Sequence, residues 1–205
     1  ICIYSVTAPD NFDGMETFGK LFFSDIHTFE KELHSEIEKI AIMDELPINW
    51  TYPEIQPKLL EEARKRVASL INCKPEEIYF TSCGSESDNT ALKGIAYANQ
   101  NKGKHIITSK IEHPAILHSC QNLESKGFEV TYLDVDKDGF VNLETLENSI
   151  RPDTILISIM FANNEIGTIE PIEEIAKIAH KNGMIFHTDA VQACGNIPID
   201  VQKMD

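Results

Sequence analysis

From about residue 78 onward, apolar runs of strand length alternate with amphipathic helical patterns, and this alternation limits the fold more than any other feature. Strands are predicted near 78–81, 105–108, 129–133, 155–160 and 184–186. Helices are predicted before and between most of them, over 53–71, 86–98, 114–126, 143–150 and 171–181. Strands separated by helices pair in parallel, because the chain crosses back over the sheet between them. The sequence therefore predicts an α/β fold, a mostly parallel sheet with helices on both faces.

The first 50 residues carry a weaker pattern and are left as an unassigned N-terminal segment. A strand is predicted over 2–6, a turn-rich loop over 9–14, and an amphipathic helix from about His27. The character of the sequence changes after Pro47, so the boundary between the two regions is placed at 47–53.

Charge and cysteine content exclude several classes of protein. Asp and Glu outnumber Lys and Arg by 33 to 18, and the formal charge of −15 repels both nucleic acid and anionic membrane surfaces. No apolar run approaches the roughly 18 residues that a membrane span needs. The five cysteines form no CxxC pair, which favours reduced thiols in the cytoplasm over a disulfide framework. We expect neither nucleic acid nor membrane as a partner.

The first unusual strand end leads from Thr81 into a turn of small residues that includes Gly84 and Ser85. The N-terminus of a helix offers unpaired N–H groups and partial positive charge, so this turn can hold a phosphate. An ordinary turn capped by serine explains the same residues.

Two further strand ends carry polar side chains. His113 stands between Glu112 and a proline that begins a helix, so it projects from a loop, although an exposed histidine is often incidental. Asn163 and Asn164 follow the strand near 155–160, and paired amides can bond a planar ligand or simply form a turn.

The fourth strand end carries Asp189 and Gln192 directly after a short buried strand. Asp189 alone is explained equally well as the cap of a following helix. In a parallel sheet, however, ligands bind at the carboxyl ends of the strands, where all four groups are expected to meet. A phosphate cradle, a histidine, an amide and an acid together suit a phosphorylated planar heterocycle with a basic ring nitrogen. Pyridoxal phosphate fits this description, and no metal site is predicted.

Four ordered motifs, at 80–89, 112–115, 162–168 and 187–192, resemble those of the cysteine desulfurases in the class V aminotransferase group. The resemblance runs from about residue 58 to the end of the sequence. It implies that 51–205 is part of the pyridoxal-phosphate-binding large domain of a fold type I enzyme. It further implies that Gly84 and Ser85 hold the cofactor phosphate and that His113 stacks on the pyridine ring.

The resemblance gives the remaining roles to Asn164, Asp189 and Gln192. Asn164 bonds the hydroxyl side of the ring, with Gln192 nearby. Asp189 pairs with the ring nitrogen and keeps it protonated, so that the ring can accept electron density from the substrate. His113 and Asp189 are therefore the predicted catalytic residues.

The implied reaction removes sulfur from L-cysteine, leaving L-alanine and a persulfide that is passed to a sulfur-acceptor protein for iron-sulfur cluster assembly or thiolation. A homodimer is implied for the complete protein. Two alternatives stay open: another class V enzyme, such as a selenocysteine lyase or an aminotransferase, and a non-catalytic remnant with a binding role.

The sequence also departs from the family pattern. The Schiff-base lysine of a Ser-x-His-Lys type motif and the persulfide cysteine both belong beyond Asp205, and the family's N-terminal segment is absent. We therefore expect these 205 residues to be a fragment that is inactive alone. Cys83 and Cys194 lie close to the motifs but not at the sulfur-accepting position, and are interpreted as small buried apolar residues.

Overall fold

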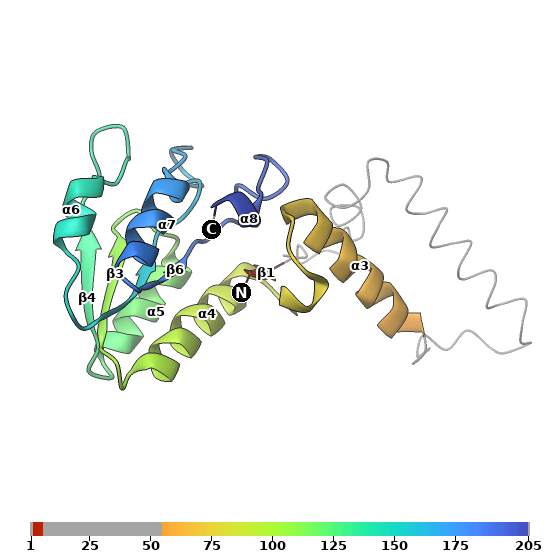
Figure 1. Cartoon of the computed structure of the whole chain (residues 1–205), viewed down its shortest axis with the longest axis horizontal. Coiled ribbons are helices and arrows are strands. Elements are labelled where there is room, and N and C mark those ends of the chain that lie inside the picture. The colour runs from red at the N-terminus through yellow and green to blue at the C-terminus, as the bar shows by residue number, and fades with distance from the viewer. Residues whose placement is uncertain (1, 6–54, 205) are drawn as a thin grey trace, which may run out of the picture.

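The computed structural model describes residues 2–5 and 55–204 (Figure 1). Their helices and strands, in chain order, are β1 (Cys2–Ser5), α3 (Ile55–Ile71), the 3-10 turn η1 (Pro75–Glu77), β2 (Ile78–Thr81), α4 (Gly84–Asn99), β3 (His105–Ser109), α5 (Pro114–Glu124), β4 (Glu129–Leu133), α6 (Leu143–Asn148), β5 (Thr154–Ser158), α7 (Ile172–Lys181), β6 (Ile185–His187) and α8 (Val201–Met204). Every strand and helix predicted between residues 53 and 186 is present, with ends that differ by about two residues at most.

Four of these strands form a fully parallel sheet in the order β4-β3-β5-β6. The strands β3 and β5 occupy its centre, and every residue of both is buried. Sheets buried on both faces have strands without polar alternation, which explains the continuous apolar runs in the sequence. The predicted α/β fold with a mostly parallel sheet is confirmed.

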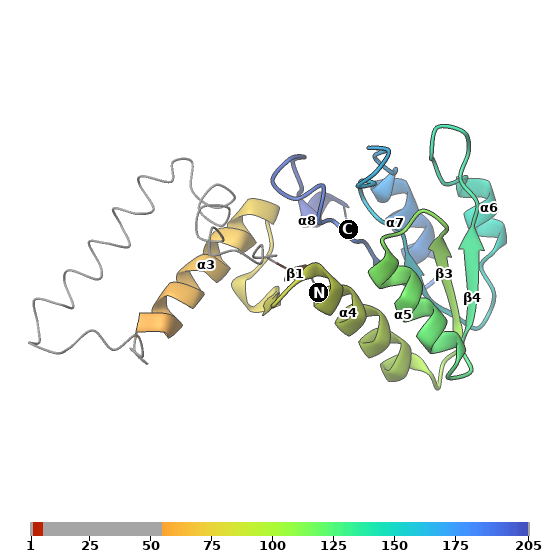
Figure 2. The same cartoon turned by 180° about the vertical axis from the view of Figure 1, so that it is seen from behind.

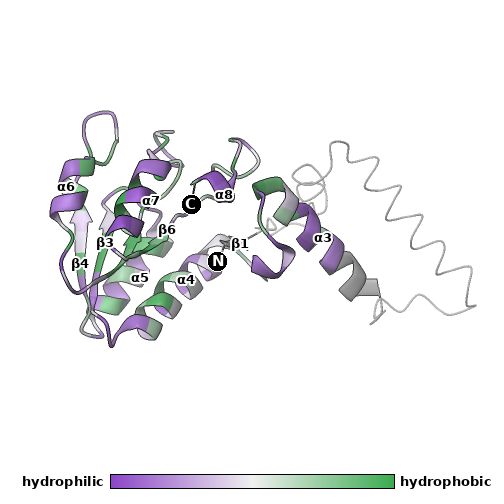
Figure 3. Ribbon diagram, viewed as in Figure 1, coloured by the Kyte–Doolittle hydropathy of each residue, from purple (hydrophilic) through white to green (hydrophobic). Residues whose placement is uncertain are grey.

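Helices cover both faces of this sheet. Figure 1 shows α6 and α7 on one face, and Figure 2, from behind, shows α4 and α5 on the other. Alternate residues of the central strands enter the two hydrophobic cores, one on each face of the sheet. Ile107 and Ile157 pack toward α6 and α7, whereas Ile106 and Leu156 pack toward α4 and α5. The helices α4, α5, α6 and α7 combine hydrophobic and hydrophilic stretches in Figure 3, as expected when one face of a helix packs on a sheet.

The strand β2 lies outside this sheet, which corrects the expectation that all four polar strand ends share one edge. It pairs in parallel with β1, in a register that sets Cys2 opposite Ile78. The helix α3 extends away from the sheet in Figure 1, and its last turns pack Val67 and Ile71 against Ile78. The chain returns from β2 to the main sheet through α4.

Two helices are followed by a glycine with a positive φ. Gly127 and Gly183 lie just past α5 and α7 with φ of 87° and 73°, the left-handed conformation that glycine adopts at little cost.

The strand predicted over 2–6 is confirmed as β1. The loop over 9–14, the helix from His27 and the boundary at 47–53 lie outside the described residues. Within 2–5 and 55–204, no helix has the length and apolar character to cross a membrane.

Candidate active site

A cavity of about 240 Å³ opens where the carboxyl end of β2 faces those of β3, β5 and β6. Its lining includes all six residues predicted to bind a cofactor, Gly84, Ser85, His113, Asn164, Asp189 and Gln192. The remaining lining residues are Cys83, Asp88, Met160, Ala162 and Val191. Although β2 belongs to a separate sheet, the four strand ends still meet around one space. The roles given to the six residues remain predictions.

The N-terminus of α4 faces this cavity with its first N–H groups uncapped by a side chain. Cys83, the N-cap residue, has extended backbone and makes no side-chain cap. Glu86, in the first turn of α4, instead accepts hydrogen bonds from the N–H and Oγ of Ser82 at 2.7 and 2.6 Å and so fixes the loop before the helix. These bonds lower the pKa of Glu86. The serine-capped turn considered from the sequence is therefore absent, and the N–H groups near Gly84 and Ser85 can receive an anion.

His113 is both the N-cap of α5 and a wall of the cavity. Its Nδ1 accepts a hydrogen bond from the N–H of Ala115 at 3.1 Å. A ring nitrogen that accepts is unprotonated, so the neutral imidazole carries its proton on Nε2. The helix cap therefore fixes the ring tautomer as well as the ring position.

The two neighbouring asparagines have different environments. Asn163 is buried, and its Nδ2 donates to the carbonyl of Ile111 while its Oδ1 accepts from the N–H groups of Glu165 and Ile166. These bonds hold the loop after β5 against the loop after β3. Asn164 is exposed and lines the cavity. Only the second asparagine is available to a ligand.

Asp189 is 8% exposed and lies directly beyond β6. Its Oδ1 accepts from the N–H of Val191 at 3.0 Å, a side-chain turn two residues long. The segment that follows is a series of turns, so the helix-cap interpretation of Asp189 is wrong. The hydrogen bond from Val191 occupies Oδ1 and not Oδ2. It holds the carboxyl group at the cavity.

Asp88, a 5% exposed acid that was not predicted from the sequence, also lines the cavity. Burial, with the charge of Asp189 as a second cause, raises the pKa of Asp88 to about 7. The helix period contained a signal for it, because position 88 is four residues after Gly84 and so lies on the same face of α4. No group of His, Cys, Asp and Glu suited to a metal ion occurs within the described part of the chain.

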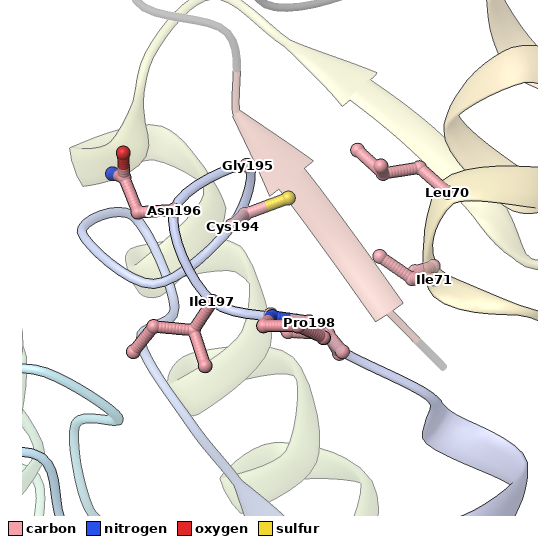
Figure 4. A pocket seen from close by; sticks show the side chains of 8 residues that line it. Leu70, Ile71, Cys194, Gly195, Asn196, Ile197 and Pro198 are labelled. Atoms are coloured by element: carbon pink, nitrogen blue, oxygen red, sulfur yellow. The ribbon is translucent and has the colours of Figure 1, made fainter.

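Cys83 and Cys194 lie in different places. Cys83 lines the cavity, whereas Cys194 lines a separate groove of about 230 Å³ between α3 and the loop before α8. Figure 4 shows Leu70 and Ile71 of α3 on one side of that groove and the loop with Cys194 and Ile197 on the other. Both thiols are half-buried, which corrects their interpretation as buried residues.

The cavity thus combines an uncapped helix N-terminus, an imidazole, an amide and carboxyl groups. A family model for class-V aminotransferases matches residues 54–205, most of the chain and all of these groups. The chain belongs to the class-V aminotransferase family. It is 65% identical over 143 residues to the cysteine desulfurase IscS of Methanosarcina thermophila, a match that covers 70% of this chain and 35% of that protein. It is 56% identical over 156 residues to the same-named protein of Clostridium botulinum, covering 76% and 39%.

Solved structures of similar proteins share the class-V fold described above. A NifS-like protein superposes with a TM-score of 0.71 at 42% identity, over 78% of this chain and 44% of that one. A structure titled SspA in complex with cysteine gives the same score and identity, over 75% and 45%. The predicted fold of this class-V chain is therefore confirmed. The chain spans little more than a third of the length of the curated relatives it matches.

Proposed function

We propose that this class-V chain provides the cofactor cavity of a cysteine desulfurase, which takes sulfur from L-cysteine and leaves L-alanine. The observation that carries the proposal is that Gly84, Ser85, His113, Asn164, Asp189 and Gln192 line one cavity although they come from four separate strand ends. The names of the similar proteins support the choice of reaction, since the relatives are cysteine desulfurases and one similar structure holds cysteine.

The polar groups that line the cavity suit pyridoxal phosphate. The uncapped N-terminus of α4 at Gly84 and Ser85 receives the phosphate, because its N–H groups are free and its partial charge is positive. Asp189, at the opposite strand end, receives the ring nitrogen. When bound, the cofactor supplies an electron-accepting ring that stabilises negative charge on the substrate's α-carbon.

Each protein group has a defined task around this ring. An ionised Asp189 holds a proton on the ring nitrogen by favouring the charged pyridinium. His113 would lie against the ring, and its Nε2–H would donate a hydrogen bond to the cofactor or the substrate while Nδ1 stays bound to the N–H of Ala115. Asn164 and Gln192 orient the ring through amide hydrogen bonds.

The protein is further proposed to act in the cytoplasm, as a homodimer that passes sulfur to an acceptor protein. Cys83 and Cys120 are free thiols, which agrees with a reducing compartment. Ile166 and Ile169, on the loop that carries Asn164, are 59% and 50% exposed and offer apolar surface for a subunit contact. Light scattering on the gene product tests the dimer, and a monomer at working concentration contradicts it.

The reaction is tested with the full product of the gene, pyridoxal phosphate and a thiol reductant. L-cysteine is expected to yield alanine and sulfide in equal amounts. Turnover of selenocysteine without turnover of cysteine indicates a selenocysteine lyase, and exchange of amino groups with a keto acid indicates an aminotransferase. Cofactor binding without any of these reactions favours a binding role.

A further inference from the structure

Glu112 is a buried acid that joins two strand ends beneath the cavity. It is 4% exposed and lies in the loop between β3 and α5, one residue before His113. Its Oε1 accepts a hydrogen bond from the Oγ of Ser109 at 2.6 Å and another from the N–H of Met160 at 3.0 Å. Ser109 ends β3, and Met160 follows β5 and lines the cavity. One carboxyl oxygen therefore connects the two central strands where the site is built.

The surroundings of Glu112 oppose a negative charge. The nearby charges that act on it belong to Asp189 and Glu170, both of which are acidic. None of the ion pairs formed within the described residues includes it. Burial raises the pKa of Glu112 to about 8, against the lowering effect of its two hydrogen bonds. Cys120, a further titratable neighbour, is an uncharged thiol because burial raises its pKa to about 12.

The hydrogen bonds around the carboxyl group agree with the neutral form. Oε1 accepts twice, as a carbonyl oxygen does, whereas the buried Oε2 makes no hydrogen bond. A charged oxygen left without a donor in this position is far more costly than a hydroxyl group. Glu112 therefore acts as a carboxylic acid in neutral solution.

We propose that Glu112 is a positioning residue for the cofactor site: as a neutral acid it fixes the loop after β3 to Met160 and thereby sets where the His113 ring lies over the cavity. Asn163 reinforces the same link, since its Nδ2 donates to the carbonyl of Ile111 at 2.8 Å. The chain leaves this fixed loop directly through His113 into α5, so movement at Glu112 displaces the imidazole. This inference rests on the proposed function only in taking the ligand of the cavity to be pyridoxal phosphate.

Three variants of the full gene product separate positioning from simple destabilisation. Glu112→Gln keeps a neutral group and an accepting oxygen, while Glu112→Ala removes the link. Glu170→Ala is the matched control, because Glu170 is 2% exposed and its carboxyl group also accepts from a backbone N–H, that of Val141, but makes no hydrogen bond to the loop that carries His113. Two quantities are measured: the dissociation constant of pyridoxal phosphate, and amide hydrogen exchange in the segment 109–116 of the cofactor-free protein.

Glu112→Ala is expected to raise the dissociation constant about tenfold and to speed exchange in this segment. Glu112→Gln and Glu170→Ala are expected to stay within about twofold of the parent for the dissociation constant. The proposal is overturned if Glu112→Ala binds as the parent does, if Glu112→Gln is as weak as Glu112→Ala, or if the parent does not bind the cofactor. Neither measurement uses cysteine turnover. A parent that binds the cofactor but forms no alanine therefore refutes the proposed reaction and leaves the role of Glu112 standing.

Discussion

The N–H of Phe161 donates a hydrogen bond to the carbonyl oxygen of Asp189 at 2.8 Å. This bond continues the parallel ladder between β5 and β6 past the last paired residues, Ser158 and His187. The backbone of Asp189 is thus fixed by the sheet, while its side chain is fixed separately by the N–H of Val191. Substitution of the side chain leaves the backbone bond in place, so the chemical role of the carboxyl group can be tested without dismantling the site.

Asp189→Ala in the full gene product is expected to lower the rate of alanine formation from L-cysteine at least about 100-fold, because the ring nitrogen loses the charge that keeps it protonated. Asp189→Asn keeps an oxygen for the Val191 N–H but lacks the charge, and is expected to be similarly slow. The measurement is alanine release under saturating cofactor, with circular dichroism as the control for folding. Near-normal turnover of Asp189→Ala excludes the assigned role.

Ser85→Asp places a negative charge at the exposed N-terminus of α4, where the phosphate is expected. The dissociation constant of pyridoxal phosphate should rise at least about tenfold through repulsion, while that of pyridoxal, which lacks the phosphate, should hardly change. Ser85→Ala controls for loss of the hydroxyl group. An acid near a helix N-terminus does not destabilise the helix, so the fold is retained. Equal weakening for both ligands shows that the phosphate binds elsewhere.

The two asparagines should respond differently to removal. Asn163→Ala deletes hydrogen bonds to Ile111, Glu165 and Ile166 and is expected to lower the free energy of unfolding by about 1–3 kcal/mol. Asn164→Ala should change it by less than about 0.5 kcal/mol, since the residue is exposed, yet should weaken cofactor binding. Urea unfolding and cofactor titration of both variants provide the comparison. The reverse ranking of the two unfolding energies contradicts the structure.

Stability of the cofactor-free protein is expected to fall as the pH rises from 6.5 to 8. The pKa of Glu112 is raised from 4.5 to about 8, so the folded state keeps a proton that the unfolded state has released, and rising pH favours unfolding up to pH 8. Burial lowers the pKa of His187 from 6.5 to about 4. This shift makes the stability rise with pH, but only below pH 6.5. Asp88, with its pKa of about 7, adds to the decline in the lower part of the window.

Glu112→Gln removes the largest contribution to that decline. Its free energy of unfolding should depend less steeply on pH between 6.5 and 8, by up to about 1.4 kcal/mol per pH unit. Urea unfolding at several pH values measures both slopes. If the parent and the variant have parallel slopes, Glu112 is ionised in the folded protein and the account of its neutral form is wrong.

The sequence was sufficient for the parallel α/β architecture because continuous apolar strands and amphipathic helices are local patterns. It was also sufficient to bring His113, Asn164 and Asp189 to one place, since the carboxyl ends of parallel strands in one sheet converge. Gly84 reaches the same cavity from the separate sheet of β1 and β2. The pairing of β2 with β1 was not predictable in this way, because it joins segments more than 70 residues apart whose register depends on tertiary contacts.

The contacts of side chains in loops were also not predictable from the sequence. Asn163 and Asn164 are chemically identical, and only the distant carbonyl of Ile111 decides that the first is structural. The burial of Glu112 is equally hidden from the sequence, because it depends on Met160, 48 residues away. Asp88, by contrast, was accessible from the helical period alone.

The most direct test of the central claim is a crystal structure of the full gene product with pyridoxal phosphate. We expect the phosphate at the N–H groups of Gly84 and Ser85, the His113 ring against the pyridine, and the ring nitrogen within roughly 2.7–3.2 Å of an Asp189 carboxyl oxygen. A cofactor bound outside this cavity, or one whose ring nitrogen faces away from Asp189, would contradict it.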